Sequence, residues 1–443
     1  MAGHNRRVGR RQPRAASAPE HVTVRIDSLT AGGAGRTITT QGGERRTIEI
    51  AGALPGETVR ASILVERRGY WQAELVQVLE ASPDRRPPAC RHFGICGGCA
   101  VQHWAEQSYA AWKAAAPVGA LRALGVTPAR ILPMLGTEPG ARRRADLTLR
   151  HTARGVLAGF ARRGSHEIID VVECPVLMPA LAQLLPQLRV LAANVLPQGG
   201  SAEAVVNWTD TGVDVVLVPE ERLVLNLDRR TALAGFAEMA NVARLSWGQR
   251  RSAETIATRR VPRLRLGTVD VEPPPGAFLQ ATIPSEAALR TAVRIWLGSA
   301  SRVVDLYAGL GTLSLGLLPR CHVTLIEGDR AAVAAVQAGL RKAGLEGKAS
   351  AVVRDLASDP LRAAELGGFD AAIFDPPRAG AGTQAAEMAR SRLPVIIAVS
   401  CDPRSFARDA RTLVDGGYRL EQLMPVDQFL WSPHVELAAL FRR

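Results

Sequence analysis

The sequence of 443 residues contains no long apolar run and only six cysteines. No stretch approaches the roughly 18 consecutive apolar residues that a membrane span requires, and the N-terminal region lacks the apolar core of a secretory signal. We therefore expect a cytoplasmic protein with no membrane partner. In a reducing compartment, so few cysteines argue against disulfides and for metal binding or nucleophilic chemistry.

The composition is that of a folded globular protein, because 47% of the residues are hydrophobic and 22% are charged. The chain is longer than one hydrophobic core usually organises, so we expect two or three domains. We find no internal repeat and no long low-complexity tract.

The formal net charge of +13 is carried mostly by arginine. A positive field attracts polyanions, and the guanidinium group binds phosphate oxygens with two hydrogen bonds, so nucleic acid is the leading candidate partner. A codon bias towards arginine would give the same composition.

The N-terminal part predicts a basic tail and a small barrel. Residues 1–19 are rich in Arg, Gly, Ala and Pro, which is typical of a disordered tail. Residues 20–82 carry short alternating apolar bursts separated by glycine turns, which predicts a β-barrel of the oligonucleotide-binding type. Residues 67–71 place arginines beside Tyr70 and Trp71, which suits phosphate contact with base stacking, although an ordinary barrel rim explains them equally well.

A proline-rich segment at residues 82–88 predicts a linker, and residues 83–284 are expected to form a central domain. Its pattern is mixed α+β and does not predict a topology. The leucines at residues 177–191 have helical spacing, and the strand-like runs are residues 204–206, 213–218 and 223–227.

Residues 285–443 predict an α/β domain of the Rossmann-like type, with a parallel sheet covered by helices on both faces. Ligands bind such sheets at the carboxyl ends of the strands. The apolar runs that predict the strands are residues 303–306, 323–326, 351–353, 371–374 and 395–399.

Residues 305–312 read DLYAGLGT and predict a strand, a glycine turn and then a helix that begins near Leu313. Gly309 and Gly311 allow the backbone to approach a ligand closely. The segment lacks the G-x-G-x-x-G pattern and a P-loop lysine, so we do not expect it to bind phosphates.

Acidic residues follow the next three strands, at Glu327, Asp355 and Asp375. Glu327 lies 16 residues beyond Gly311, near the distance at which nucleotide-binding folds place the carboxylate that binds ribose hydroxyls. An acidic pocket without phosphate-binding features suits a cationic nucleoside. We therefore predict S-adenosylmethionine as the cofactor.

Asp375 opens the sequence Asp-Pro-Pro-Arg. Methyltransferases that act on amino groups have a similar Asp-Pro-Pro, but an aromatic residue that stacks on the flipped base follows it. Here Arg378 follows, which weakens that interpretation. A proline-rich turn that closes a strand is the purely structural alternative.

Cys401 follows the fifth apolar run, and a helix is expected to begin near Arg404. A helix N-terminus and a nearby arginine would favour the thiolate, although an ordinary buried cysteine is the alternative. C5 of a pyrimidine is a weak nucleophile until a thiolate adds to C6, after which C5 attacks a methyl group carried on sulfonium. A base must then remove the C5 proton. Glu436 is our candidate for that base, and His434 is its rival.

Four other cysteines form a second constellation. Cys90, Cys96 and Cys99 lie on one glycine-rich loop, and Cys174 lies far downstream. Three thiolates on a tight loop with a distant fourth predict a four-sulfur metal site, and the spacing suits zinc and iron-sulfur comparably. Cys321 belongs to neither group and is expected to be structural.

With these motifs together, the chain resembles the uracil-5-methyltransferases that modify tRNA and 23S ribosomal RNA, in the branch with an N-terminal TRAM domain. The resemblance covers nearly the whole chain. It rests on residues 31–36 and 53–57, the four cysteines with Gln102 and His103, and residues 305–312, 400–403 and 434–436.

The resemblance implies that the four cysteines hold a [4Fe-4S] cluster, that Cys401 is the nucleophile and that Glu436 is the base. It also implies that Arg142, Arg143 and Arg144 lie where the family carries RNA-binding basic residues. The chain departs from the family where Thr312 replaces a frequent Asn and where residues 278–282 read FLQAT rather than FFQ-x-N. The contacts implied with S-adenosylmethionine or the target base are those of Gln280, Tyr307, Thr312, Glu327 and Asp375.

We therefore predict a monomeric enzyme that methylates C5 of a uridine in structured RNA. The TRAM-like barrel favours 23S rRNA over tRNA. An RNA cytosine-5 methyltransferase is one alternative, which in its two-cysteine form would need a partner for Cys401, and the domain offers only Cys321. A non-catalytic RNA-binding factor that keeps the cluster and fold as a scaffold is the alternative from a different class.

Overall fold

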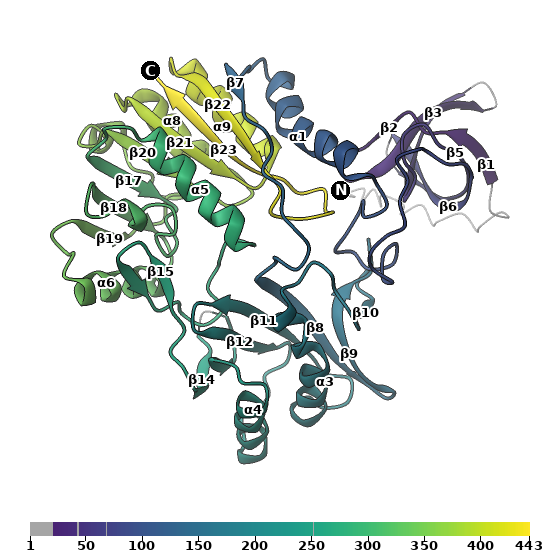
Figure 1. Cartoon of the computed structure of the whole chain (residues 1–443), viewed down its shortest axis with the longest axis horizontal. Helices are drawn as coiled ribbons and strands as arrows, with labels where there is room; N and C mark the ends of the chain where they lie inside the picture. The colour runs from purple at the N-terminus through teal and green to yellow at the C-terminus, as the bar shows by residue number, and fades with distance from the viewer. Residues whose placement is uncertain (1–20, 42–43, 68, 251) are drawn as a thin grey trace, which may run out of the picture. The chain divides into compact units, whose positions relative to one another are not determined.

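The computed structural model describes residues 21–41, 44–67, 69–250 and 252–443. The predicted tail at residues 1–19 and Arg68 lie outside these residues. The described chain forms two compact units, one that ends at Arg85 and one that runs from Arg86 to Arg443 (Figure 1). None of its described helices is both long and apolar enough to cross a membrane.

The first unit is a six-stranded sheet of order β1-β5-β6-β4-β3-β2, antiparallel except between β4 and β6. Alternate side chains, such as Val22 and Val24, are buried in its apolar core, as period-two patterning predicts. The order leaves β1 and β2 at the two ends, so closure into a TRAM barrel stays a prediction. The strands are β1 (His21–Arg25), β2 (Ser28–Leu29), β3 (Ala34–Gln41), β4 (Glu44–Ala51), β5 (Thr58–Arg67) and β6 (Tyr70–Glu80).

The second unit contains a central sheet of order β10-β9-β8-β11-β12-β13-β14. Its strands pair antiparallel except β12 and β13. Helices α3 and α4 share one apolar core with this sheet. Its elements are β8 (Arg144–Thr152), β9 (Gly155–Ala161), β10 (Ile168–Asp170), α2 (Pro179–Ala182), α3 (Leu184–Val195), β11 (Ser201–Thr209), β12 (Gly212–Pro219), α4 (Leu227–Met239), β13 (Arg244–Trp247) and β14 (Glu254–Thr258).

The predicted strand at residues 223–227 is wrong. Leu223 and Leu225 lie in irregular backbone, and Leu227 is the first residue of α4. The side chain of Asn226 accepts a hydrogen bond of 3.0 Å from the N–H of Arg229, so this apolar run ends in a helix cap.

The same unit contains an eight-stranded sheet of order β19-β18-β17-β20-β21-β23-β22-β7, which we call the catalytic sheet because it carries the predicted site residues. The first five strands are parallel, β23 is antiparallel to both its neighbours, and β7 is parallel to β22. The strands are β7 (Arg130–Ile131), β17 (Arg302–Leu306), β18 (His322–Glu327), β19 (Ala349–Val353), β20 (Ala371–Phe374), β21 (Val395–Ser400), β22 (Arg419–Val426) and β23 (Glu436–Arg442).

Helices cover both faces of this sheet, which confirms the predicted α/β architecture. Successive strand residues alternate between two cores, so that Val303 packs with α5 and α6 while Val304 packs with α9. The β15–β16 hairpin lies on the α6 side. These elements are α5 (Ile283–Trp296), α6 (Arg330–Ala343), β15 (Leu264–Leu266) and β16 (Val269–Val271) on one face, and α1 (Glu106–Ala123), α7 (Ala363–Leu366), α8 (Gly382–Arg390) and α9 (Pro403–Asp415) on the other.

The segment before the central sheet also contributes to the catalytic layers. Helix α1 packs against α9 and β22, and β7 adds the eighth strand beside β22 (Figure 1). Both elements fall within residues 83–284, which the sequence pattern groups as one central domain. Segments on both sides of the central sheet in the sequence therefore contribute to the catalytic sheet and its helices.

The helix predicted near Leu313 is only the short 3-10 turn η1 (Leu315–Leu317). Leu318 has an extended backbone with ψ of 144°. Pro319 follows it, and a residue that precedes proline is disfavoured in the helical region, which explains why the helix does not continue.

Candidate active site

The carboxyl ends of four parallel strands place the predicted residues along one edge of the catalytic sheet. Asp305 lies near the end of β17, Glu327 ends β18, Asp375 follows β20, and Cys401 follows β21. Because β18, β17, β20 and β21 are neighbours in this order, the four side chains form a row across the edge.

At the β17–β18 end of the row, the glycine turn is held by a carboxylate. Glu327 Oε2 accepts a hydrogen bond of 2.8 Å from Gly309 N, and its Oε1 accepts one of 2.8 Å from Asp329 N. Gly309 has φ of 55°, and a Cβ there would meet no atom within 4 Å, so this part of the turn faces open space. Gly311 differs, because a Cβ there would lie 2.6 Å from Leu315 Cγ.

Asp305 is buried, and its carboxyl group lies near the Ser314 hydroxyl. Burial raises the pKa of Asp305 to about 7, and the nearby charges of Asp375 and Glu327 act in the same direction. A buried carboxyl group at this edge of the sheet is a ready contact for a polar or cationic ligand.

The other predicted cofactor contacts border the same turn. Tyr307 has φ of 59°, a left-handed conformation that is unusual for a residue with a side chain. Burial raises the pKa of Tyr307 to about 12. Thr312 is partly buried in the turn after Gly311. Asp355 follows β19 and accepts hydrogen bonds from Ser358 Oγ at 2.8 Å and Ala357 N at 3.1 Å, which lower its pKa.

A chain of two glutamines connects the two carboxylates at the other end of the row. Gln280 Nε2 donates to Asp375 Oδ2 at 3.1 Å, and Gln428 Nε2 donates to Gln280 Oε1 at 3.0 Å. Gln428 Nε2 also donates to Glu436 Oε2. Gln428 lies just beyond β22, near the start of β23, and belongs to none of the sequence motifs.

The two carboxyl groups that the glutamines connect, Asp375 and Glu436, both have raised pKa values. Burial raises the pKa of Asp375 to about 7. Burial and the charge of Asp375 raise the pKa of Glu436 well above its ordinary value, and Glu436 Oε1 has no hydrogen-bond partner among the described residues. A buried carboxylate with one free oxygen and a raised pKa is suited to accept a proton.

Cys401 shares this environment with Glu436, Asp375 and Arg378. Burial and the charges of Glu436 and Asp375 raise the pKa of the Cys401 thiol to about 11, while Arg378 opposes the shift through its charge and a hydrogen bond. The expectation that the thiolate is favoured is therefore wrong for the ligand-free protein. The N-terminus of α9 does not reverse the shift, because Asp402 Oδ1 already accepts 2.9 Å hydrogen bonds from Arg404 N and Ser405 N.

This raised pKa gives a prediction for the RNA-free protein. Alkylation of Cys401 by iodoacetamide should be slow at pH 7 and should rise about tenfold per pH unit towards pH 11, because only the thiolate reacts. Mass spectrometry of the Cys401 peptide measures the rate. Arg378→Met should slow alkylation at every pH below 11, because it removes the cation that lowers the pKa. A plateau already reached by pH 8 would contradict this description of the site.

His434 is exposed and lies edge-on to the Phe429 ring, with 6.1 Å between the ring centres. Burial of part of its ring and the charge of Arg378 lower its pKa. Glu436, in contrast, is buried and hydrogen-bonded into the glutamine chain. The geometry therefore favours Glu436 over His434 as the base.

The three arginines at 142–144 are not equivalent. Arg143 is buried, donates from Nε to Gln280 O at 3.0 Å and pairs with Glu286, so it fixes the backbone of Gln280 rather than facing RNA. Arg142 lies 5.8 Å from the Phe429 ring centre and Arg144 4.8 Å from that of the exposed Phe278. The expectation of RNA contact is thus wrong for Arg143 and stays a prediction for the other two.

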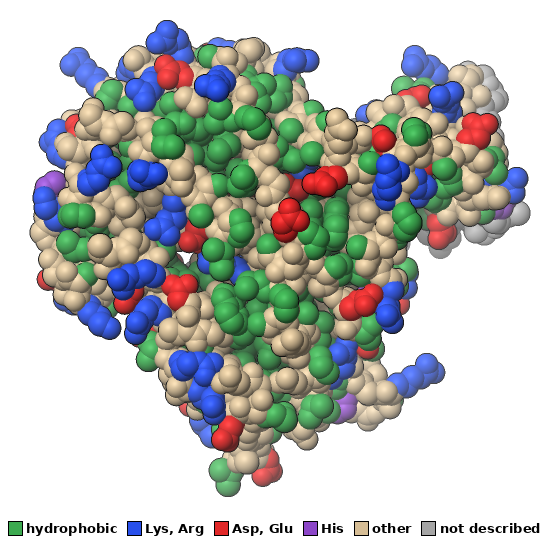
Figure 2. Space-filling model, in the orientation of Figure 1, with side chains coloured by type: hydrophobic (Ala, Val, Ile, Leu, Met, Phe, Trp, Pro, Cys, Tyr) green, Lys and Arg blue, Asp and Glu red, His purple; other side chains and the backbone are tan. Residues whose placement is uncertain are grey.

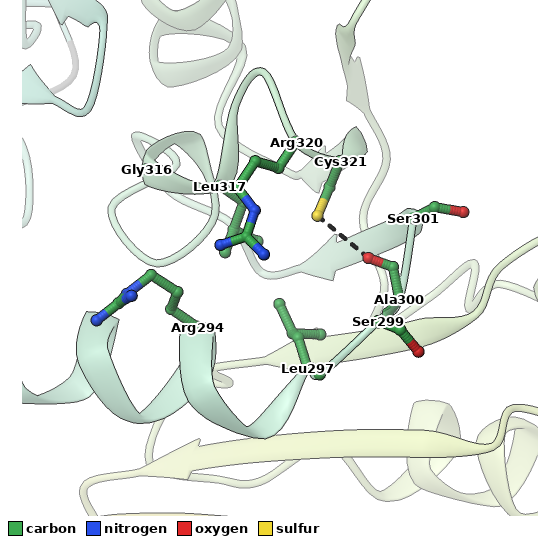
Figure 3. A pocket seen from close by; sticks show the side chains of 10 residues that line it. Arg294, Leu297, Ser299, Ala300, Ser301, Gly316, Leu317, Arg320 and Cys321 are labelled. Atoms are coloured by element: carbon green, nitrogen blue, oxygen red, sulfur yellow. Dashed lines mark hydrogen bonds between the residues drawn. The ribbon is translucent and has the colours of Figure 1, made fainter.

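Cys321 lies at the opposite edge of the sheet from Cys401. It precedes the first residue of β18, whereas Cys401 follows the last residue of the parallel strand β21. In Figure 3 the Cys321 side chain points to the carbonyl of Ala300, to which its sulfur donates at 3.3 Å, in a pocket with Arg294 and Arg320. Cys321 is therefore not placed to act as a second thiol beside Cys401.

The other four cysteines lie on two segments that are joined by contacts, one of them with β9. Gly97 N donates to Ala161 O at 2.9 Å, and Arg91 pairs with Glu173 at 3.0 Å, which ties the Cys90–Cys99 loop to the Cys174 segment. The thiols lie within electrostatic reach of one another, and burial raises the pKa of Cys96, Cys174 and, to about 12, Cys99. Among the described residues, no three His, Cys, Asp or Glu side chains are placed to hold one metal ion, so the metal site stays a prediction.

The positive charge of the chain is partly structural. Arg244 is buried and makes two 2.9 Å hydrogen bonds to Asp214 in the central sheet. On the face drawn in Figure 2, the coloured Lys and Arg side chains are spread out rather than gathered into one patch. In the first unit, the Arg46 guanidinium lies 4.6 Å from the Trp71 ring centre, so one face of that ring has a cation partner.

Comparison with known proteins identifies the family. A protein of Brucella melitensis described as an uncharacterized RNA methyltransferase is 41% identical over 420 residues, which is 95% of this chain and 97% of that protein. The chain belongs to the RNA methyltransferase family. A 23S rRNA (uracil(1939)-C(5))-methyltransferase, RlmD, of Chromohalobacter salexigens is 33% identical and covers 90% of this chain and 85% of that protein, so the predicted kinship with uracil-5-methyltransferases is confirmed.

The fold agrees with this family. The crystal structure of Pyrococcus abyssi tRNA (uracil-54, C5)-methyltransferase in complex with S-adenosyl-L-homocysteine matches 95% of this chain and all of that chain, with a TM-score of 0.69 and 23% identity. A family model described as conserved hypothetical protein 95 matches residues 279–391, which include Gln280, the glycine turn and Asp375.

The positions of two site residues, Arg378 beside Cys401 and Gln428 beside Glu436, could not be read from the sequence motifs. Arg378 lies beside Cys401 because β20 and β21 are adjacent, which the order of strands in such sheets could have indicated. Gln428 lies beside Glu436 because β22 and β23 pair antiparallel, with Val426 opposite Glu436. The apolar pattern of the last 25 residues carries no signal for that register.

Proposed function

We propose that this RNA methyltransferase transfers a methyl group from S-adenosylmethionine to C5 of a uridine in structured RNA. The observation that carries the proposal is the grouping of a cysteine, an arginine and two buried carboxyl groups at adjacent strand ends, namely Cys401, Arg378, Asp375 and Glu436. Methylation of an amino group needs no thiol, whereas methylation at C5 of a pyrimidine does.

The residues around the glycine turn fit S-adenosylmethionine. The buried carboxyl group of Asp305 and the carboxylate of Glu327 offer acidic contacts beside the open space at Gly309, without a phosphate-binding group. Tyr307, Gly311, Thr312 and Asp355 border the same site. When bound, the cofactor would supply an electrophilic methyl group and a positive charge that favours the thiolate form of the cysteine.

Cys401 and Glu436 divide the chemistry on the uridine. The Cys401 thiol first loses its proton to solvent. The thiolate then forms a bond to C6, the C5–C6 double bond opens, and the electron pair moves to C5 and O4. The electron pair at C5 then forms a bond to the methyl carbon, while the bond between that carbon and the sulfonium sulfur breaks and its electron pair stays on the sulfur. Glu436 takes the proton from C5, the electron pair restores the C5–C6 double bond, and the sulfur leaves C6 as thiolate. No oxidant or reductant is required.

Gln280 and Asp375 are proposed to contact the target base. They lie between the cofactor end of the row and Cys401, and Gln280 is nearly buried in the loop that α5 follows. Arg143 holds that loop, because Arg143 N donates to Ala281 O at 2.9 Å. A flipped base would thus meet a rigid amide and carboxyl pair.

The product of the reaction tests the function. Purified protein, S-adenosylmethionine and RNA from a strain that lacks the gene should yield 5-methyluridine, measured by nucleoside mass spectrometry and mapped by sequencing. We propose 23S rRNA as the substrate, because the named 23S rRNA relative aligns with 90% of the chain. 5-Methyluridine in tRNA alone would replace that substrate, and 5-methylcytidine or no methylated nucleoside would overturn the function.

We also propose that Cys90, Cys96, Cys99 and Cys174 hold a [4Fe-4S] cluster. The four thiols lie within electrostatic reach of one another, and backbone N–H groups point to the sulfurs of Cys96 and Cys174, as with Gly98 N to Cys96 Sγ at 3.5 Å. Protein purified without oxygen should be brown and contain about four irons per chain. Colourless protein with stoichiometric zinc would contradict the cluster and leave a zinc site.

The domain roles follow from the same proposal. We propose that residues 20–82 act as the TRAM-like RNA-binding domain and residues 285–443 as the methyltransferase domain. Of residues 83–284, the sheet from β8 to β14 makes the central domain, while α1, β7 and the β15–β16 hairpin belong with the methyltransferase domain. We expect the protein to act as a monomer, which light scattering of the purified protein tests.

A further inference from the structure

Gln428 is held in one orientation by a neighbour that can only donate. The backbone N–H of Ala281 donates to Gln428 Oε1 at 3.1 Å. An N–H group cannot accept a hydrogen bond, so this contact fixes which end of the Gln428 amide carries oxygen. The two N–H groups of Gln428 Nε2 must therefore face away from Ala281, towards Glu436 and Gln280.

The orientation of Gln428 in turn fixes that of Gln280. Because Gln280 Oε1 accepts from Gln428 at 3.0 Å, the Gln280 NH2 group points to the other side, where it donates to Asp375 Oδ2 at 3.1 Å. Reversal of the Gln280 amide would place two NH2 groups against each other and an oxygen against the Asp375 carboxylate. Both hydrogen bonds would be lost in a buried site, where lost hydrogen bonds are costly.

The segment that carries Gln428 is itself anchored on both sides. The preceding Asp427 forms a buried ion pair with Lys113 on α1, and the Lys113 ammonium also donates to Phe429 O at 2.7 Å. Tyr109 OH donates to Asp427 and accepts from Trp431 N at 2.9 Å. Gln428 is thus bracketed by residues that the buried α1 side chains hold in place.

The direction in which Gln280 presents its amide matters for base choice. An amide nitrogen has two N–H groups, and the second N–H of Gln280 Nε2 has no partner among the described residues. Uracil carries a carbonyl oxygen at C4 and an N–H at N3, whereas cytosine carries an amino group at C4 and an acceptor at N3. A pocket that presents the Gln280 N–H beside an Asp375 acceptor therefore complements uracil and opposes cytosine.

We propose that Gln428 is a positioning residue that sets the choice of uracil over cytosine by locking the Gln280 amide with its N–H groups towards the base. This inference rests on the proposed function. It assigns the discrimination to a residue that need not touch the base, because Gln428 acts through Gln280. The same side chain orients Glu436, so the residue connects base choice to the proton-accepting group.

The test uses two RNA fragments that differ only by U or C at the mapped target position. With Gln428→Met, which keeps the length of the side chain without its hydrogen bonds, Gln280 is free to reverse. We expect the ratio of kcat/KM for the U fragment to that for the C fragment to fall at least about tenfold. In the Gln428→Glu variant, at a pH above the pKa of the introduced carboxyl group, the side chain can only accept hydrogen bonds. Gln280 should then reverse its amide, and the U-to-C ratio should fall further.

Gln422→Met is the matched control. Gln422 lies on β22 and accepts from Trp296 Nε1 at 3.2 Å, outside the glutamine chain, so its ratio should equal that of the unmodified protein. A general loss of rate through Glu436 would lower both kcat/KM values and leave their ratio unchanged, so the ratio separates positioning from a merely structural role.

The outcomes distinguish this inference from the proposed function. If the unmodified protein methylates neither fragment, the proposed function fails. Suppose that the unmodified protein prefers the U fragment and that both Gln428 variants have its melting temperature and its affinity for S-adenosylmethionine. If both variants then also keep its U-to-C ratio, the role of Gln428 is overturned. If one variant does not fold, the ratio of the other decides.

Discussion

Replacement of Cys401 by alanine is expected to lower the rate of RNA methylation by at least about 10³-fold, because the sulfur that activates C5 is lost. Cys401 is partly buried at a strand end and its side chain is small, so the variant should fold and bind S-adenosylmethionine as the unmodified protein does. Single-turnover transfer of a labelled methyl group to RNA measures the effect.

Cys321→Ala is the control for that experiment. Cys321 is also in the catalytic sheet, but it lies at the amino end of β18 and donates to Ala300 O (Figure 3). Its replacement should leave the methylation rate within about twofold of that of the unmodified protein, because the buried Cys321 side chain is small and lies away from the row of site residues. Loss of activity in Cys321→Ala but not in Cys401→Ala would reverse the assignment of the nucleophile.

Replacement of Glu436 by glutamine is expected to lower steady-state turnover by about 10²- to 10⁴-fold, the usual contribution of a general base. Addition of sulfur and transfer of the methyl group precede proton removal, so a covalent protein–RNA species should accumulate. Denaturing gel electrophoresis with labelled RNA detects it. His434→Ala should retain turnover, because His434 is exposed and outside the glutamine chain.

Glu421→Gln provides a matched change of charge. Glu421 lies on β22, and its Oε2 is 3.3 Å from Arg442 Nε on the neighbouring strand. This pair is partly exposed and remote from the row of site residues, so its loss should cost little. A Glu436→Gln variant that turns over like Glu421→Gln would show that another group removes the C5 proton.

The parallel sheet and the row of site residues could be predicted from the sequence because their signals are local. Apolar runs that end in an acid or a cysteine identify strand ends, and parallel strands bring their carboxyl ends to one edge. The sequence therefore predicts Glu327, Asp355, Asp375 and Cys401 at one edge of the sheet. The structure keeps that row.

Features that depend on pairing between distant segments could not be predicted in the same way. Residues 83–284 look continuous, yet α1 and β7 pack on the catalytic sheet because their apolar faces meet α9 and β22. The sequence suggests that Arg143 contacts RNA, but the structure shows that it pairs with the buried Glu286, which is 143 residues away in the sequence.

Electrostatics was the least predictable part of the site. An arginine and a helix N-terminus near Cys401 suggest a low thiol pKa, but burial and two carboxylates outweigh them, and Asp402 occupies the helix N-terminus. Whether a thiol is ionised depends on all charges around it, and a sequence does not give those distances. The raised pKa suits an enzyme whose nucleophile is activated only when the site is filled.

The most direct test of the central claim uses RNA substituted with 5-fluorouridine. Fluorine at C5 replaces the proton that Glu436 would remove, so the reaction should stop after methyl transfer with Cys401 still bonded to C6. Incubation with S-adenosylmethionine should give a protein–RNA species that survives denaturant, that maps by mass spectrometry to the Cys401 peptide, and that is absent from Cys401→Ala. No such species with active protein, or its persistence in Cys401→Ala, would contradict the account.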